Sequence, residues 1–143
     1  MESVDPAVAA ALARLYDLDV SGDPGDLDLY LALAERAGGP IVELCAGSGR
    51  IAVPLALAGH RVTGVDEDPA MLERAEARAR DAGLDSQTRP QLVLGDVHSA
   101  SIPGSGTFGL GIIGLNSLLL LGDARSQRRA VSKRPILGTR RIQ

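Results

Sequence analysis

Residues 41–49, Ile-Val-Glu-Leu-Cys-Ala-Gly-Ser-Gly, form an apolar segment with one acid, Glu43, that runs directly into a Gly47-x-Gly49 turn. Glycine lacks a Cβ atom, so such a turn can bend tightly and let a ligand approach the backbone at van der Waals distance. A helix is predicted to begin near Arg50, and its free N–H groups would point into the same space. The pattern therefore predicts a strand, a ligand-binding turn and a helix, and a nucleotide is the ligand class it favours.

The composition is that of one globular domain. The chain has 143 residues, 45% of them hydrophobic, which is enough to bury a core. Its single cysteine, Cys45, cannot form an intramolecular disulfide, and one cysteine with two distant histidines offers no zinc spacing, so we expect no metal. The acidic amino terminus leads no apolar signal core, and the longest apolar stretch, residues 108–122, is shorter than the roughly 18–20 residues of a membrane span. We expect a cytoplasmic protein with no membrane segment.

The net charge of −3 conceals an uneven distribution of charge along the chain. Residues 1–123 hold all 18 acids and only 8 of the 15 bases, whereas residues 124–143 hold the other 7 bases and no acid. Apolar periodicity ends at about Val131, so residues 132–143 are predicted to be an unstructured basic tail. Such a tail can bind nucleic acid, but the acidic body and the 2% aromatic content argue against that partner.

Glycines and prolines divide the acidic part into alternating helices and strands. This alternation predicts an α/β fold, a Rossmann-like open parallel sheet with flanking helices. Residues 1–40 are predicted to form an N-terminal helical cap and residues 41–131 the core. Pro54 lies close enough to the start of its helix to be tolerated. The predicted helices are 6–15, 29–37, 50–58 and 69–82, with an acidic loop over 17–28, and the predicted strands are 41–46, 61–65, 91–94 and 108–113.

Acids follow most of the predicted strands. Ligands of open parallel sheets bind at the carboxyl ends of the strands, so the residues that follow each strand are the candidates for a site. Asp66 and Glu67 follow the second strand and Asp96 follows the third, while Glu43 lies within the first. Asn116 follows the fourth strand. The rim of the predicted site is therefore negative.

This negative rim distinguishes two ligands that use similar turns. Residues 47–52 also fit the G-x-G-x-x-G/A pattern of dinucleotide enzymes, with Asp66 placed for a ribose. The pyrophosphate of a dinucleotide would be repelled, because one like charge about 6 Å away costs roughly 3 kcal/mol at an effective dielectric near 20. A sulfonium ligand with an ammonium group, an adenine amine and ribose hydroxyls would find acceptors in the acids instead. We therefore favour S-adenosylmethionine.

The segments Glu43–Arg50, Val65-Asp66 and Gly95-Asp96-Val97 resemble the class I S-adenosylmethionine-dependent methyltransferases of the small-molecule type, over about residues 15–130. The resemblance implies that Glu43 orients the turn and faces the methionine ammonium. It implies that Asp66 accepts from both ribose hydroxyls and Asp96 from the adenine amine. The other cofactor-binding residues that it implies are Ala46, Gly47, Ser48 and Gly49 along the methionine, Glu67 and Met71 near the adenine, Val97 against its ring, Asn116 beside the methyl group, and Tyr16 or Tyr30 closing the site.

The sequence departs from the family pattern at two places. Cys45-Ala46 stands where the family has glycine before its Gly-x-Gly, which we treat as a mild departure because alanine still fits a close turn. After residues 128–131 the resemblance implies three further strands, and residues 132–143 supply none of them. We therefore expect a chain truncated at its carboxyl end, with the last strands of the sheet missing and the fourth strand left as an unpaired apolar edge.

Several alternatives stay open. Methyl transfer needs alignment more than a strong base, so no catalytic residue is assigned, although His98 is a candidate general base. Asn116 caps a helix or touches a substrate, and Cys45 is expected to be a small buried side chain. Residues 73–80 are predicted to form a solvated helix face with a Glu76–Arg80 pair. The function that we favour is methyl transfer to a small molecule. The alternatives are a truncated and inactive form of such an enzyme, an NADP-type oxidoreductase and a non-catalytic cofactor-binding fragment. The acceptor and the oligomeric state stay unassigned.

Overall fold

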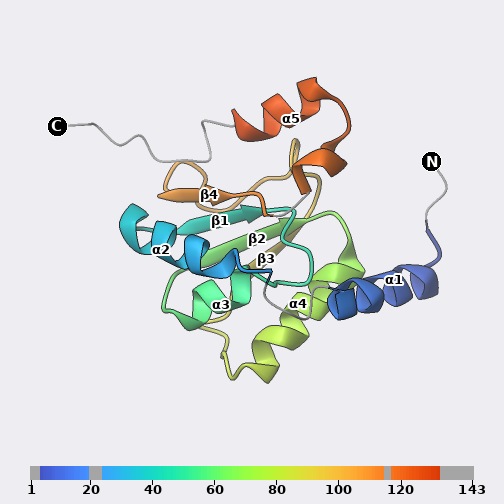
Figure 1. Ribbon diagram of the computed structural model, residues 1–143, viewed down its shortest axis with the longest axis horizontal. Coiled ribbons are helices and arrows are strands. Elements are labelled where there is room, and N and C mark those ends of the chain that lie inside the picture. The colour runs from blue at the N-terminus through green and yellow to red at the C-terminus, as the bar shows by residue number, and fades with distance from the viewer. Residues whose placement is uncertain (1–3, 20–23, 115–116, 133–143) are drawn as a thin grey trace.

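A four-stranded parallel sheet forms the centre of the computed structural model, which describes residues 4–19, 24–114 and 117–132 (Figure 1). The strand order is β3-β2-β1-β4, and β1 pairs in parallel with both β2 and β4. The chain therefore steps outward from β1 to β3 and then returns to the other side of β1, which makes the carboxyl end of β1 the switch point where ligands of such sheets bind. The strands are β1 (Ile41–Leu44), β2 (Val62–Asp66), β3 (Gln91–Leu94) and β4 (Leu110–Ile112).

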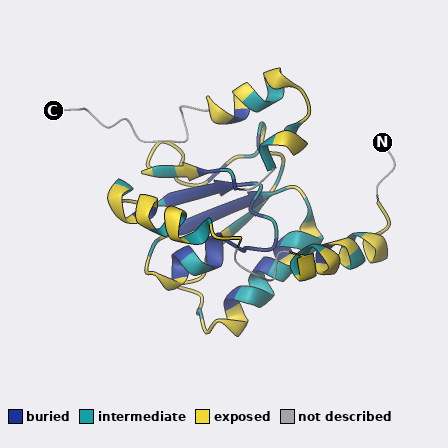
Figure 2. Cartoon of the chain, in the orientation of Figure 1, coloured by how far each residue is buried: buried dark blue, intermediate teal, exposed yellow. Residues whose placement is uncertain are grey.

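Helices cover both faces of this sheet. On one face, helices α2 and α3 pack against Ile41, Val62 and Ile112, and on the other, helix α5 packs through Ala130. Figure 2 shows β1 and β2 as the buried centre and the outer sides of the helices as exposed. The predicted α/β class and open parallel sheet are confirmed. The helices are α1 (Pro6–Asp19), α2 (Leu27–Ala37), α3 (Ala52–Leu57), α4 (Pro69–Asp81) and α5 (Ala124–Val131), with a 3₁₀ helix, η1 (Ser117–Leu121), before α5.

The predicted acidic loop over residues 17–28 is wrong at both ends. Helix α1 continues through Asp19, and α2 already begins at Leu27. Tertiary contacts hold both ends of this segment. Asp17, near the end of α1, pairs with arginines of α4, and Asp26, just before α2, pairs with Arg50. The sequence around these acids indicated a loop, because the arginines that pair with them lie far away in the chain.

Helix boundaries elsewhere agree with local rules. The side chain of Asp68 accepts a hydrogen bond from the Ala70 amide at 2.9 Å, and Pro69 occupies the first position of α4. Helix α3 begins at Ala52, so Pro54 is its third residue and its missing N–H is one that a helix start leaves unpaired anyway.

Strand β4 lies at one end of the sheet. Within residues 4–19, 24–114 and 117–132 it pairs only with β1, which confirms the predicted edge position of the fourth strand. None of the helices in these ranges has the length and apolar character needed to cross a membrane. Most of the predicted basic tail lies outside the described residues.

Candidate functional site

The glycine loop, residues 45–49, follows β1 at the switch point of the sheet. Gly47 has φ 55° and Gly49 has φ 78°, a region that favours glycine. A Cβ atom built on Gly49 would lie 3.1 Å from both Ala75 and Val53, so this glycine lets the loop pack against two helices. A Cβ built on Gly47 would meet no atom within 4 Å. Gly47 therefore faces open space, where a ligand can approach the backbone.

Cys45 carries the strained backbone of the loop. It is the residue outside glycine that has a positive φ, 58°, among those the structure describes. A side chain in this region costs roughly 1–2 kcal/mol. We expected the departure Cys45-Ala46 to be mild because alanine fits a close turn. That expectation is incomplete. Ala46 is buried without a positive φ, and Cys45 occupies the position whose φ favours glycine.

Asp66 ties the end of β2 to the glycine loop. Its Oδ2 accepts a hydrogen bond from the Gly47 amide at 2.8 Å, and its Oδ1 accepts one from the Asp68 amide at 2.9 Å. The side chain is only partly buried. Each carboxylate oxygen can accept two hydrogen bonds, so both oxygens keep capacity for another donor.

Glu43 is a buried acid with one free oxygen. The residue is 3% exposed, and its carboxylate accepts from the Ala52 amide at the start of α3. Within the described chain, its Oε2 is buried without a hydrogen-bond partner. Burial raises the pKa of Glu43 to about 8, against the opposing attraction of the nearby Arg50. An orphaned buried acceptor of this kind suits a ligand cation that would pair with it.

The carboxyl ends of three strands bring their acids together around Cys45. The pKa of the Cys45 thiol is raised to about 11, first by burial and then by the negative charges of four carboxylates, Asp66, Glu67, Glu43 and Asp96. The predicted negative rim is therefore present as a cluster. Its charge repels anions and favours a cationic ligand.

The remaining predicted residues lie in different surroundings. Asp96 is exposed and accepts from the His98 amide at 2.7 Å. Val97 is buried in the core cluster on one sheet face, and Nδ1 of His98 is buried without a partner in the described chain. Other predicted residues are placed as follows: Ala46, Ser48 and Gly49 are buried, Gly47 and Met71 half-buried and Glu67 exposed, while Asn116 lies outside the described residues.

Arg50 is a residue that the sequence did not mark as functional. It directly follows the glycine loop, is 9% exposed, and donates two hydrogen bonds to Asp26, at 2.8 and 2.9 Å. The hydroxyl of Tyr16 also hydrogen-bonds to Arg50, and Tyr30, a residue of α2, packs against the core. Tyr16, one of the two tyrosines considered from the sequence, thus contacts the residue next to the loop.

The predicted solvated face of α4 is confirmed for Glu73 and Arg80, which are exposed, and wrong for its two other arginines and for the predicted ion pair. Arg74 and Arg78 both pair with Asp17 of α1, and Arg78 Nε donates to the backbone carbonyl of Ser48 at 3.0 Å. Glu76 pairs with Arg89 at 2.8 Å and not with Arg80. Helical spacing identifies neighbours on one helix, and these partners come from other elements.

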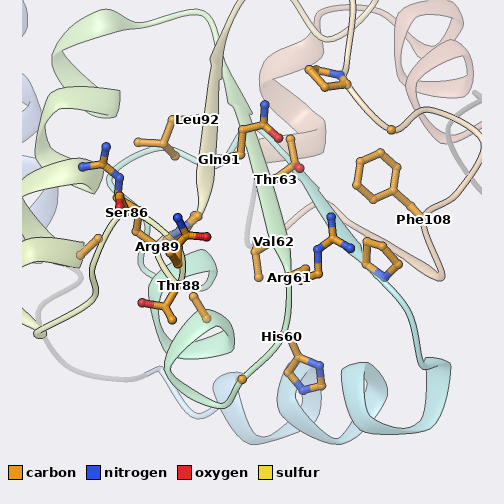
Figure 3. A pocket seen from close by; sticks show the side chains of 18 of the residues that line it. His60, Arg61, Val62, Thr63, Ser86, Thr88, Arg89, Gln91, Leu92 and Phe108 are labelled. Carbon is orange, nitrogen blue, oxygen red and sulfur yellow. The ribbon is translucent and has the colours of Figure 1, made fainter.

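A groove of about 770 Å³ opens at the amino ends of the strands, at the opposite end of the sheet from the glycine loop (Figure 3). The amino ends of β2 and β3 line it, with His60, Arg61, Arg89 and Gln91 among its side chains. None of the predicted cofactor residues lines this groove. No group of three or more metal-ligating side chains occurs in the described parts of the chain.

A family model agrees with this geometry. The model described as a methyltransferase domain matches residues 41–131, more than half of the chain, and the match includes the glycine loop and all four strands.

Curated relatives match this chain over short stretches. An uncharacterized protein of Mycobacterium tuberculosis is 46% identical over 50 residues, which cover 35% of this chain and 18% of the relative. A ubiquinone biosynthesis O-methyltransferase of Methylobacterium sp. is 40% identical over 40% of this chain and 23% of its own length. A 23S rRNA (uracil(1939)-C(5))-methyltransferase of Shewanella piezotolerans is 42% identical over 37% of this chain and 12% of its own length. These alignments cover less than a quarter of each relative.

Solved structures share the fold. A candidate S-adenosyl-L-methionine-dependent methyltransferase of Methanococcus maripaludis superposes with a TM-score of 0.72 at 22% identity, covering 97% of this chain and 62% of that one. The CcbJ methyltransferase of Streptomyces caelestis superposes with a TM-score of 0.67 at 25% identity, covering 82% of this chain and 50% of that one. The chain thus spans about half to two thirds of the length of these structures. With a Rossmann-like sheet, a glycine loop at its switch point and a matched domain over residues 41–131, the chain belongs to the methyltransferase domain family.

Proposed function

We propose that this chain binds S-adenosylmethionine at the carboxyl ends of β1, β2 and β3 and forms the cofactor-binding part of a methyltransferase that acts on a small molecule. The observation that carries the proposal is the buried Oε2 of Glu43, which has no partner in the described chain and belongs to the strand that leads into the glycine loop. A ligand ammonium group would satisfy this acceptor. Membership of the methyltransferase domain family supports the same cofactor.

Each cofactor contact follows from the chemistry of the residue concerned. Glu43 would pair with the methionine ammonium, and the backbone around Gly47 would lie along the methionine chain. Asp66 would accept from the ribose hydroxyls while it keeps its bond to the Gly47 amide. Asp96 would accept from the adenine amine. The further contacts that we propose are Ala46, Ser48 and Gly49 along the methionine, Glu67, Met71 and Val97 around the adenine, and Asn116 near the methyl group.

The chain's task in the reaction is alignment. The bound cofactor supplies a methyl group on a positively charged sulfur, which is already activated for displacement. The glycine loop and the acids therefore serve to fix the orientation of the cofactor and to keep its reacting end at one place. Such positioning can lower the activation free energy of a two-substrate reaction by a large amount. The proposal requires no general base, and His98 is not given that role.

A small-molecule acceptor suits the charge of the site. Asp66, Glu67 and Asp96 act electrostatically on Cys45 at the end of the sheet where the acceptor would enter, and Glu43 adds a fourth negative charge above its pKa of about 8. The negative charge here would repel an approaching phosphodiester backbone. We therefore favour a small molecule over RNA as the acceptor. The single cysteine suits a reducing compartment, and we extend the proposal to a cytoplasmic location.

The proposal also orders the chain into parts. Residues 1–40, with α1 and α2, would form a cap beside the cofactor, and residues 41–131 the cofactor-binding core. Residues 132–143 would form a basic tail. Methyl transfer by the whole protein would draw its acceptor-binding residues from outside the core.

Calorimetric titration of the chain with S-adenosylhomocysteine and, separately, with NADPH tests the proposal. We expect saturable binding of S-adenosylhomocysteine and none of NADPH, because the acidic rim opposes a pyrophosphate. Binding of NADPH alone would favour the oxidoreductase alternative. Binding of neither ligand by a folded chain would refute the proposed cofactor site.

A further inference from the structure

Arg78 of α4 contacts two parts of the molecule at once. Its Nε donates to the carbonyl oxygen of Ser48 in the glycine loop at 3.0 Å, and its Nη2 donates to Oδ1 of Asp17 in α1 at 3.2 Å. The Asp17 side chain is only 12% exposed and also pairs with Arg74. The planar guanidinium holds these donors in a fixed relation, so a shift of either partner is transmitted to the other.

A second polar connection joins the same two regions. Arg50, directly after the glycine loop, forms two hydrogen bonds to Asp26 and one with the hydroxyl of Tyr16 in α1. Both connections therefore run from the amino-terminal segment to the loop that would hold the methionine end of the cofactor.

Apolar packing of α1 is slight by comparison. Ala13 is the buried residue of this helix, while Val8, Leu12, Leu15 and Leu18 are 50–72% exposed. Figure 2 shows α1 as exposed along most of its length, with α4 beside it. The ion pairs of Asp17 therefore contribute a large share of what holds α1 in place.

We propose that Arg78 is a positioning residue that couples the docking of α1 to the geometry of the glycine loop, and through the loop to cofactor affinity. The proposal rests on the proposed cofactor site. When α1 leaves α4, Arg78 loses one of its two partners and the Ser48 carbonyl loses a fixed donor. The docked helix thus favours the loop geometry that binds the cofactor, and by thermodynamic reciprocity the bound cofactor favours the docked helix.

Three variants separate this coupling from general stability. Asp17→Asn removes the charge that holds α1 without touching the loop, and Arg78→Gln removes the bridge itself. Arg80→Gln is the matched control, because Arg80 lies on the same helix, is exposed and makes no ion pair among the described residues. Each variant is titrated with S-adenosylhomocysteine, and amide hydrogen exchange is followed in α1 and at Gly47 and Gly49.

We expect Asp17→Asn and Arg78→Gln each to weaken binding roughly 3–30-fold and Arg80→Gln to leave it unchanged. Added S-adenosylhomocysteine should slow exchange in α1 of the unaltered protein, and Arg78→Gln should abolish this slowing, which a merely structural arginine would not do. Asp17 lies in α1, outside residues 41–131. Its variant therefore keeps the test valid if Arg78→Gln fails to fold.

Wild-type affinity in both variants would overturn the coupling. If the unaltered chain binds no S-adenosylhomocysteine, the proposed cofactor site fails, and the coupling is then judged on the unliganded protein. Faster exchange at Gly47 and Gly49 in Asp17→Asn would support it, and unchanged exchange would overturn it.

Discussion

The Asp66 carboxylate accepts a hydrogen bond from the Gly47 amide at 2.8 Å, across 19 residues of chain. The acid at the end of β2 therefore shapes the glycine loop as well as lining the proposed ribose site. A second bond, from the Asp68 amide, holds the same carboxylate at the start of α4. One side chain thus links the loop, the strand and the next helix.

Replacing Asp66 by alanine should weaken S-adenosylhomocysteine binding by about 1.5–3 kcal/mol for each charge-assisted hydrogen bond lost. The loss has two sources, the ribose contacts and the anchor of the loop. Calorimetry measures it, with Asp81→Ala as the control, since Asp81 is an exposed acid at the far end of α4. Unchanged affinity in Asp66→Ala would mean that the ribose lies elsewhere.

Glu43 should make the protein less stable as the pH rises. Its pKa is about 8 in the folded chain and 4.5 as a free side chain, so between these values the folded state holds a proton that the unfolded state has released. The free energy of unfolding should then fall by about 1.4 kcal/mol per pH unit from this residue, and Glu43→Gln should remove that slope. Urea unfolding at pH 5, 6.5 and 8 measures both proteins. Equal slopes would show that Glu43 is ionised in the folded protein.

The same acid should give cofactor binding a pH dependence. A ligand ammonium prefers the ionised carboxylate, so affinity for S-adenosylhomocysteine should rise with pH up to about 8 and level off above it, with a proton released on binding. Titration in buffers of different ionisation enthalpy detects that proton. Glu43→Gln should bind more weakly and release none; proton release that persists in this variant would assign it to another group.

The Arg50–Asp26 pair should contribute to stability. Arg50 is 9% exposed, so removing one partner leaves a poorly solvated charge. We expect Asp26→Asn and Arg50→Gln each to lower the free energy of unfolding by about 2 kcal/mol, with the double variant losing less than the sum. Chemical unfolding of the four proteins completes the cycle. Strict additivity would contradict a direct interaction.

Cys45 gives a test of backbone strain with an internal control. Cys45→Gly and Cys45→Ala both remove the thiol, but only glycine tolerates the φ of 58° at this position. We expect the glycine variant to be about 1 kcal/mol more stable than the alanine variant. Thermal and urea unfolding compare the two. An alanine variant as stable as the glycine variant would show that the loop relaxes.

The sequence was sufficient for features whose cause is local. The alternation of apolar runs with glycine and proline predicted the parallel sheet, and Asp68-Pro69 marked the start of α4. The strand containing Glu43, followed by Gly47 and Gly49, predicted where a ligand would bind. These signals depend on backbone conformation and on neighbours within a few residues, so they can be read along the chain.

By itself, then, the sequence determined the order of the four strands and of helices α1 to α4, the place of the glycine loop and the sign of the charge around it. Only the tertiary structure decided which acids are structural: Asp17 and Asp26, which looked like parts of a solvated loop, bind Arg78 and Arg50 across 61 and 24 residues of chain. The tertiary structure also decided that Cys45 takes the strained turn position and that Glu43 keeps a buried oxygen without a partner in the described chain. The physical reason is that ion pairing, burial and desolvation depend on which distant segments the fold brings together.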